Sequence, residues 1–228
     1  GTSASDLAVP AALEALDRSV DFYGALFRMT ARYLDARSLT AIHDWWSHPQ
    51  MAVPTFRGCN RSCAFCGGSA FSFRRFFGRD RTAFRPPALV ARDVANLARY
   101  TGAPLFLLGD PREPGDDYAE ELFRRIGALR LPNAVCVELY RPAPERFFDV
   151  LATNLPAFNL EISPETHDEE GRRACGKFYP NDALLDTLRY ALERGSGRID
   201  LFCMVGLPRQ DRSSVLDTVA WCDELMGR

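Results

Sequence analysis

From about Gln50 onward, short apolar runs alternate with longer amphipathic segments. Gly, Pro, Asn and Asp flank the apolar runs, as is typical of strands that end in turns. The intervening segments place apolar residues at helical spacing and carry helix start and stop signals. The pattern predicts strands at residues 51–56, 104–108, 134–139, 158–162 and 198–205. It predicts helices at residues 87–100, 116–129, 144–155, 181–194 and 213–226.

Strand and helix alternate about five times, which is typical of a parallel sheet with right-handed crossovers. The predicted fold class is therefore α/β, and the pattern alone leaves a doubly wound sheet and a partial barrel open. In both folds, functional groups gather at the carboxyl ends of the strands. Residues 1–49 differ, because Leu13, Leu16 and Val20 recur at helical spacing after Pro10. We therefore expect a helical N-terminal segment or linker before a domain at residues 50–228.

The composition, 46% hydrophobic and 25% charged over 228 residues, is that of a folded soluble domain and excludes collagen-like and disordered classes. A net charge of −2 gives no basic field for nucleic acid. No apolar run approaches the roughly 20 residues needed to cross a bilayer. The seven cysteines are an odd number without a visible signal peptide, which favours a reducing, cytoplasmic location. The chain begins at Gly1 and stops after the fifth βα unit, so we expect a fragment of a longer protein.

Three cysteines, Cys59, Cys63 and Cys66, form a C-x3-C-x2-C arrangement directly after the first predicted strand. Three thiolates so close in sequence can bind one soft metal centre. A structural zinc site normally adds a fourth Cys or His at short spacing, whereas a four-iron cluster can keep three protein ligands and one open iron. Unrelated core cysteines and a zinc site completed by a distant ligand remain the alternatives.

The spacing of Cys59, Cys63 and Cys66, with Phe65 before the last cysteine, resembles the C-x3-C-Φ-C motif of the radical S-adenosylmethionine (radical SAM) superfamily. The resemblance runs from about Val53 to the end of the chain. It implies a partial (β/α)6 barrel, truncated here after five units, with a [4Fe-4S] cluster whose open iron binds SAM. A reductant such as flavodoxin or ferredoxin would then supply the electron that cleaves SAM to a 5′-deoxyadenosyl radical. This radical would abstract hydrogen from a small-molecule substrate.

The same resemblance implies contacts to SAM at the strand ends, and no catalytic side chain beyond the cluster and SAM. A turn would contact the methionine amino group, a strand the ribose, cations the carboxylate, and a later turn the adenine. In that order these positions hold Gly109 and Asp110, Glu161 and Ser163, Arg173 and Lys177, and Val205, Gly206 and Leu207, with Phe65 beside the cluster. The alternatives are an ordinary Gly-Asp-Pro turn, a polar network inside the barrel and solvated surface cations.

Segments 66–69, 163–169, 176–179 and 204–208 are similar to those of radical SAM proteins that carry an N-terminal cobalamin (B12)-binding domain. This chain has no D-x-H-x-x-G motif for cobalamin ligation, so such a domain would lie upstream of Gly1. That likeness adds cobalamin-assisted methyl transfer or rearrangement to the reactions considered. The alternative function is a non-catalytic Fe–S or zinc protein for electron transfer or assembly.

Residues 57–85 interleave arginines with phenylalanines. In isolation this composition is typical of a basic–aromatic binding patch. An anionic substrate, a docking face for a partner domain, support of the cluster charge and a solvated face are all compatible with it.

Overall fold

The computed structural model describes residues 51–227, so the helical segment predicted at residues 1–49 lies outside the described part of the chain. The main sheet has five parallel strands in the order β1-β4-β5-β6-β7. This order follows the chain without reversal, whereas a doubly wound sheet reverses at a switch point. The α/β prediction is confirmed, and the winding is that of a partial barrel. The strands are β1 (Met51–Pro54), β4 (Leu105–Leu108), β5 (Val135–Leu139), β6 (Phe158–Glu165) and β7 (Ile199–Cys203).

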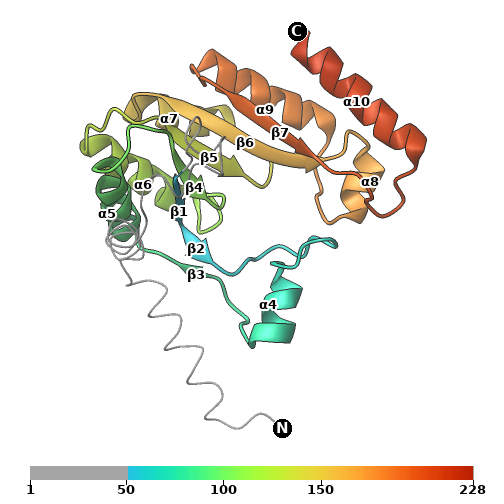
Figure 1. The fold of residues 1–228 in the computed structure, drawn as a ribbon, viewed down its shortest axis with the longest axis horizontal. Coiled ribbons are helices and arrows are strands. Elements are labelled where there is room, and N and C mark those ends of the chain that lie inside the picture. The colour runs from blue at the N-terminus through green and yellow to red at the C-terminus, as the bar shows by residue number, and fades with distance from the viewer. Residues whose placement is uncertain (1–50, 228) are drawn as a thin grey trace, which may run out of the picture.

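Helices cover one face of this sheet (Figure 1). Successive helices touch in the order α5, α6, α7 and α9, as expected when each crossover has the same hand. No helix within residues 51–227 combines the length and apolar character that a membrane crossing requires. The helices of this layer are α5 (Pro87–Ala98), α6 (Asp116–Ala128), α7 (Glu145–Asn154), α9 (Asn181–Glu193) and α10 (Arg212–Met226).

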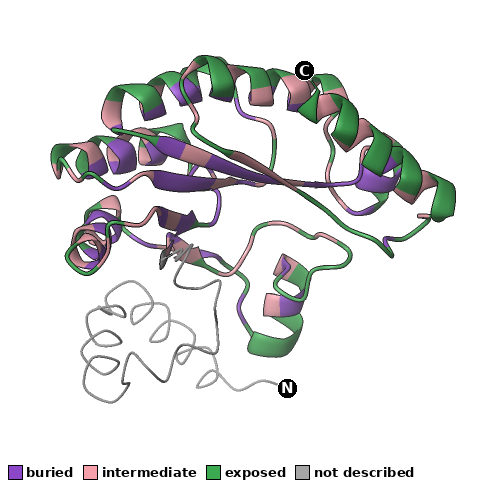
Figure 2. Cartoon of the chain, turned by 45° about the horizontal axis from the view of Figure 1, so that its top comes forward, coloured by how far each residue is buried: buried purple, intermediate pink, exposed green. Residues whose placement is uncertain are grey.

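The two faces of the sheet differ in chemistry because side chains alternate along each strand. In β5, Val135, Val137 and Leu139 are buried in the hydrophobic core beneath the helices. Cys136 and Glu138 alternate with them and therefore lie on the opposite, inner face. Buried residues concentrate in the strands and on the helix faces turned toward them (Figure 2). The core thus fixes the strands and leaves their inner face free to carry polar groups.

The remaining elements are the antiparallel pair β2 (Phe56–Arg57) and β3 (Ala83–Phe84), helix α4 (Ala70–Phe77) and helix α8 (Glu169–Ala174). The sequence pattern predicted neither α4 nor α8. Ser69 caps α4 by accepting a hydrogen bond from the N–H of Ser72, and Gly78 ends it at φ +63°. Ser72 is also the one buried residue of α4, which stands apart from the main helix layer (Figure 1). Packing therefore holds α4 less firmly than α5, α6, α7 and α9, each of which buries at least three residues.

A buried ion pair joins the segment before α5 to the middle of that helix. Arg85 and Asp93 pair directly, with side chains 5% and 0% exposed. Arg85 also donates to the carbonyl oxygen of Pro54 at 2.8 Å, and its own carbonyl accepts from the hydroxyl of Tyr118 at 2.7 Å. The pair thus fixes the chain where it leaves the first strand.

We expect Asp93→Asn to lower the free energy of unfolding by about 3–5 kcal/mol, because Arg85 would keep a buried charge without its counter-ion. Asp149→Asn, which removes an exposed contact with Arg194, is the matched control and should cost at most about 1 kcal/mol. Urea denaturation followed by circular dichroism measures both values. Similar costs for the two variants would contradict the importance of the buried pair.

Candidate functional site

The cysteine-bearing loop, residues 58–69, contains no helix or strand and lies over the carboxyl ends of the sheet strands. Two contacts made by its own residues hold it there. The hydroxyl of Thr82 donates to the side-chain oxygen of Asn60 at 2.6 Å. The N–H of Ala64 donates to the carbonyl oxygen of Cys175 at 3.1 Å. The loop is therefore fastened both to the segment before β3 and to the segment after α8.

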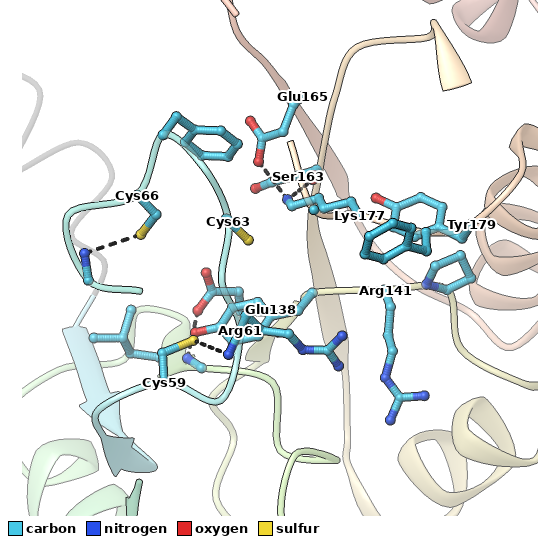
Figure 3. Close-up of a pocket in the computed structure, with 18 of the residues that line it drawn as sticks. Cys59, Arg61, Cys63, Cys66, Glu138, Arg141, Ser163, Glu165, Lys177 and Tyr179 are labelled. Atoms are coloured by element: carbon cyan, nitrogen blue, oxygen red, sulfur yellow. Dashed lines mark hydrogen bonds and ion pairs between the residues drawn. The ribbon is translucent and has the colours of Figure 1, made fainter. Parts of the chain in front are cut away.

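Cys59, Cys63 and Cys66 line one cavity of about 580 Å³ (Figure 3). Cys59 and Cys63 are half-buried, and Cys66 is exposed. The Cys59 sulfur accepts a hydrogen bond from the N–H of Arg61 at 3.3 Å, and the Cys66 sulfur accepts one from the N–H of Gly68 at 3.3 Å. Backbone N–H groups directed at cysteine sulfurs are among the interactions that tune iron–sulfur centres.

The three cysteines line one cavity, but their side chains do not converge on a single point. Within residues 51–227, no three Cys, His, Asp or Glu side chains converge closely enough to hold one metal ion. In a four-iron cluster each thiolate binds a different iron, so the sulfurs surround an inorganic core instead of meeting at one point. Burial raises the pKa of the Cys59 and Cys63 thiols, and nearby thiols add to the effect. A positively charged core would offset this cost by binding the thiolate forms.

The floor of the cavity is built from the ends of three neighbouring strands. Leu108 and Gly109 come from the end of β4, Glu138 from β5, and Ser163 and Glu165 from β6. The first βα loops and the segment after α8 form its walls. The other lining residues are Phe56, Gly58, Cys59, Arg61, Cys63, Phe65, Cys66, Gly68, Tyr140, Arg141, Pro142, Gly176, Lys177, Phe178, Tyr179 and Ala183.

Gly109 lies at a position that an L side chain cannot occupy without a local shift. Its φ is +96°, and a Cβ atom there would lie 2.6 Å from an aromatic carbon of Phe56. The N–H of Gly109 donates to a carboxylate oxygen of Glu138 at 2.6 Å. The glycine therefore lets the backbone turn at the strand end and direct a donor at the β5 carboxylate.

A strained backbone carries the second carboxylate of the cavity. β6 has a register irregularity between Ile162 and Glu165, and Glu165 adopts φ +69°. The ammonium of Lys177 donates to a carboxylate oxygen of Glu165 at 2.5 Å and also to the carbonyl of Ser163. Both charged side chains are at most one-tenth exposed. Positive φ values outside glycine concentrate at functional sites, where surrounding contacts hold them.

The decisive comparison is with protein-family models. The model described as the radical SAM superfamily matches residues 53–222, which is more than half of the chain. The chain belongs to the radical SAM superfamily. No curated protein sequence matches it.

Solved radical SAM structures share the fold at low sequence identity. The methyltransferase TsrM from Kitasatospora setae, with tryptophan substrate and a SAM analogue bound, matches with a TM-score of 0.63 and 18% identity over 81% of this chain and 35% of that protein. Methylornithine synthase, PylB, matches with a TM-score of 0.57 and 16% identity over 77% of this chain and 50% of that protein. Coproporphyrinogen III oxidase, HemN, from Escherichia coli matches with a TM-score of 0.57 and 17% identity over 85% and 46%. This radical SAM chain thus spans between a third and a half of these proteins.

Some of the residues assigned to SAM from the sequence are neighbours in the structure. Phe65, Gly109, Ser163 and Lys177 all line the cavity together with the three cysteines. The others are not among its lining residues. These are Asp110, Glu161, Arg173, Val205, Gly206 and Leu207.

The residues outside the lining either contact other parts of the protein or are exposed on its surface. Asp110 is buried and pairs with Arg112 at 2.6 Å. Glu161 is buried on the inner face, where one carboxylate oxygen lies 3.4 Å from the Cys136 sulfur, which donates to it. Arg173 is exposed at the end of α8. The turn at residues 205–207 follows β7 and is held by the side chain of Gln210.

Sequence reasoning missed several polar residues of this radical SAM site, namely Glu138, Tyr140, Arg141, Glu165 and Tyr179. Glu165 and Tyr179 lie within segments 163–169 and 176–179, whose likeness to other radical SAM proteins was noted without a role for either residue. Glu138, Tyr140 and Arg141 lie at the end of the third predicted strand, so the rule that functional groups gather at strand ends could have identified them. Glu165 follows a strand that was predicted to end at residue 162.

Glu138 gives a testable pH dependence. Burial raises the pKa of this carboxyl, and Glu161 and Asp110 add to the effect, while the N–H of Gly109 opposes it. The folded state then binds this proton more tightly than the unfolded chain, so stability falls as the pH rises from about 4 through the raised pKa. Glutamine does not titrate and can still accept the Gly109 N–H. The free energy of unfolding of Glu138→Gln should therefore rise relative to wild type between pH 4 and 7.

Urea titrations at several pH values measure this difference. Glu145→Gln on α7, whose carboxylate forms an exposed ion pair with Arg194, serves as the control. If the gain in free energy of unfolding of Glu138→Gln over wild type stays constant or shrinks with rising pH, the Glu138 carboxylate is not destabilised in the folded state.

Proposed function

We propose that this chain is the cluster- and SAM-binding part of a radical SAM enzyme. One observation carries the proposal: three cysteines from one loop line a single cavity at the carboxyl edge of a parallel sheet. Cys59, Cys63 and Cys66 would hold a [4Fe-4S] cluster, and SAM would occupy the cavity beside it. When bound, the reduced cluster and SAM supply a 5′-deoxyadenosyl radical that abstracts hydrogen from the substrate.

The polar lining suits the methionine part of SAM, which carries one ammonium and one carboxylate. Glu138 and Glu165 offer carboxylate oxygens to the ammonium. Because burial disfavours the charged form of Glu138, a cationic partner would stabilise that carboxylate. Lys177 is the nearest cation to Glu165 and would share its charge with the SAM carboxylate. Gly109 lets the Phe56 ring pack directly against the end of β4, since no Cβ fills that position.

The apolar lining would exclude water from the reacting groups. Phe65 stands beside Cys66 with 36% of its surface exposed, and Phe178 is 76% exposed beside the cavity. Ser163 lies between the cysteine side and Lys177, where its hydroxyl can bond a ribose oxygen. Bound SAM would cover these side chains and separate the cluster from bulk water.

Methyl transfer with cobalamin is the more specific reaction that we propose. The support is the likeness to two TsrM structures, one of which holds cobalamin and a [4Fe-4S] cluster and matches with a TM-score of 0.64. A cobalamin-binding domain and a reductant such as flavodoxin or ferredoxin would be partners of this chain. The substrate is a small molecule that enters from the open side of the cavity.

A non-catalytic zinc or Fe–S protein is the competing function. A structural zinc site of the usual kind would need a fourth Cys or His from outside the lining, because the described residues that line the cavity include three cysteines and no histidine. Metal analysis of the purified protein separates the two proposals, since zinc bound tightly after anaerobic iron and sulfide reconstitution would favour the competitor.

The cysteine assignment predicts how single variants behave. After anaerobic reconstitution the wild type should hold about four irons per chain. Cys59→Ser, Cys63→Ser and Cys66→Ser should each lose most of this iron, because each removes one of three ligands. Dithionite and SAM should then yield 5′-deoxyadenosine with wild type and none with these variants.

Cys222→Ser is the matched control, since Cys222 lies in α10 and is not among the residues lining the cavity. It should keep the iron content and the 5′-deoxyadenosine yield. Equal iron loss in the control, or full iron retention in any of the three loop variants, would refute the assignment.

A further inference from the structure

The loop that follows β5, residues 140–143, is held unusually firmly for a connecting segment. The N–H of Tyr140 donates to a carboxylate oxygen of Asp110 at 3.0 Å. The guanidinium of Arg112 donates to the carbonyl oxygens of Arg141 at 2.7 Å and Pro142 at 2.9 Å. Two residues of the loop after β4 thus fix three consecutive residues of the loop after β5.

The groups that hold this loop are themselves buried. Asp110 and Arg112 form an ion pair with side chains 0% and 2% exposed, and the guanidinium of Arg112 lies over the ring of Phe147. The hydroxyl of Thr187 on α9 accepts the N–H of Ala143 at 2.9 Å. The backbone around Arg141 is therefore pre-positioned by the core and does not depend on the Arg141 side chain.

Arg141 lines the cavity, and its side chain has few partners within the described part of the chain. The Arg141 side chain is 47% exposed, and its one ion pair within residues 51–227 is with Glu113, 4.0 Å away. Glu113 is already engaged, because Arg61 donates two hydrogen bonds to its carboxylate at 2.5 and 3.2 Å. Arg61 and Arg141 (labelled in Figure 3) thus share the one carboxylate of Glu113, so these three groups together carry a net positive charge.

We propose that Arg141 binds an oxyanion, a carboxylate or phosphate, of the second molecule that enters the cavity with SAM. A guanidinium held at a fixed position forms two parallel bonds with such a group at small entropic cost. Tyr140 and Phe178 line the same region and would contact a flat apolar body. The substrate class is therefore a small aromatic or other flat molecule with one anionic group.

This assignment of a substrate class rests on the proposed function, although the anion site itself is built from the protein alone. SAM also carries a carboxylate and is therefore the other candidate ligand for Arg141. Lys177 follows α8 and already has Glu165 and Ser163 as close partners, whereas Arg141 follows β5 and its side chain has, among the described residues, only a 4.0 Å ion pair with Glu113. We therefore assign the SAM carboxylate to Lys177 and the carboxylate or phosphate of the second molecule to Arg141.

The test uses three probes of similar shape: benzoate, phenyl phosphate and the neutral benzyl alcohol. Their dissociation constants are measured by ligand-observed NMR on anaerobically reconstituted protein with SAM present, and SAM affinity is measured on the same sample. The variants are Arg141→Gln and Arg141→Lys, and Arg99→Gln, an exposed arginine at the end of α5, is the control. Iron content and circular dichroism of every sample show whether it is folded and loaded.

We expect at least one anion to bind wild type and Arg99→Gln about tenfold more tightly than benzyl alcohol. Whichever anion binds better shows which oxyanion the site prefers. Arg141→Gln should remove this preference, and Arg141→Lys should retain part of it, because lysine keeps the charge but not the two-donor geometry. SAM affinity should change less than about twofold in both Arg141 variants, far below the tenfold effect expected on the anions.

Three results would overturn the proposal: equal binding of all three probes by wild type, an anion preference that persists in Arg141→Gln, or a tenfold loss of SAM affinity in that variant. Failure of the wild type to take up iron and SAM is a different outcome. It would reject the proposed function. The dissociation constants of the charged and neutral probes on the same protein would still test the anion site.

Discussion

The site depends on the placement of a loop that has no regular structure of its own. The cysteines lie between β2 and α4, and neither of these elements packs extensively against the core. Buried partners therefore do the positioning. Arg61 reaches the carboxylate of Glu113, and Gly176 approaches Ser62 so closely that an added Cβ would lie 3.2 Å from its carbonyl oxygen. The hydrogen bond from Ala64 to the carbonyl of Cys175 adds to this contact. Anything that separates these neighbours would move the sulfurs away from the strand ends.

The inner face of the sheet carries a second constraint. Parallel pairing places Glu138 opposite Glu161, and the end of β6 adds Glu165 nearby. Carboxylates gathered in a half-buried space repel one another and lose hydration, which explains the raised pKa of Glu138. Lys177 neutralises one of these carboxylates and leaves Glu138 with the N–H of Gly109. A ligand with an ammonium group would offset the remaining cost, so the electrostatics of the cavity support the proposed SAM site.

The sequence predicted the main elements well because their apolar periodicity is strong. The boundaries of α6 and α9 are reproduced within one or two residues, since Gly and Pro stand at their ends. Helix α4 was missed because its phenylalanines and arginines do not form a stripe that packs on the core. The spacing of the three cysteines predicted that they act together, and the structure places all three on one cavity. Arg141 could not be found in this way, because its role depends on a loop held by Asp110, which sequence reasoning had assigned to SAM.

The account stands or falls on whether three sulfurs share a cluster that SAM can reach. The most direct measurement is the electron paramagnetic resonance spectrum of reconstituted, dithionite-reduced protein before and after addition of SAM. We expect the signal of a reduced four-iron cluster whose shape changes when SAM is added, because SAM would bind the open iron beside Cys59, Cys63 and Cys66. A cluster signal that SAM leaves unchanged, or a protein that keeps zinc and shows no such signal, would contradict the account.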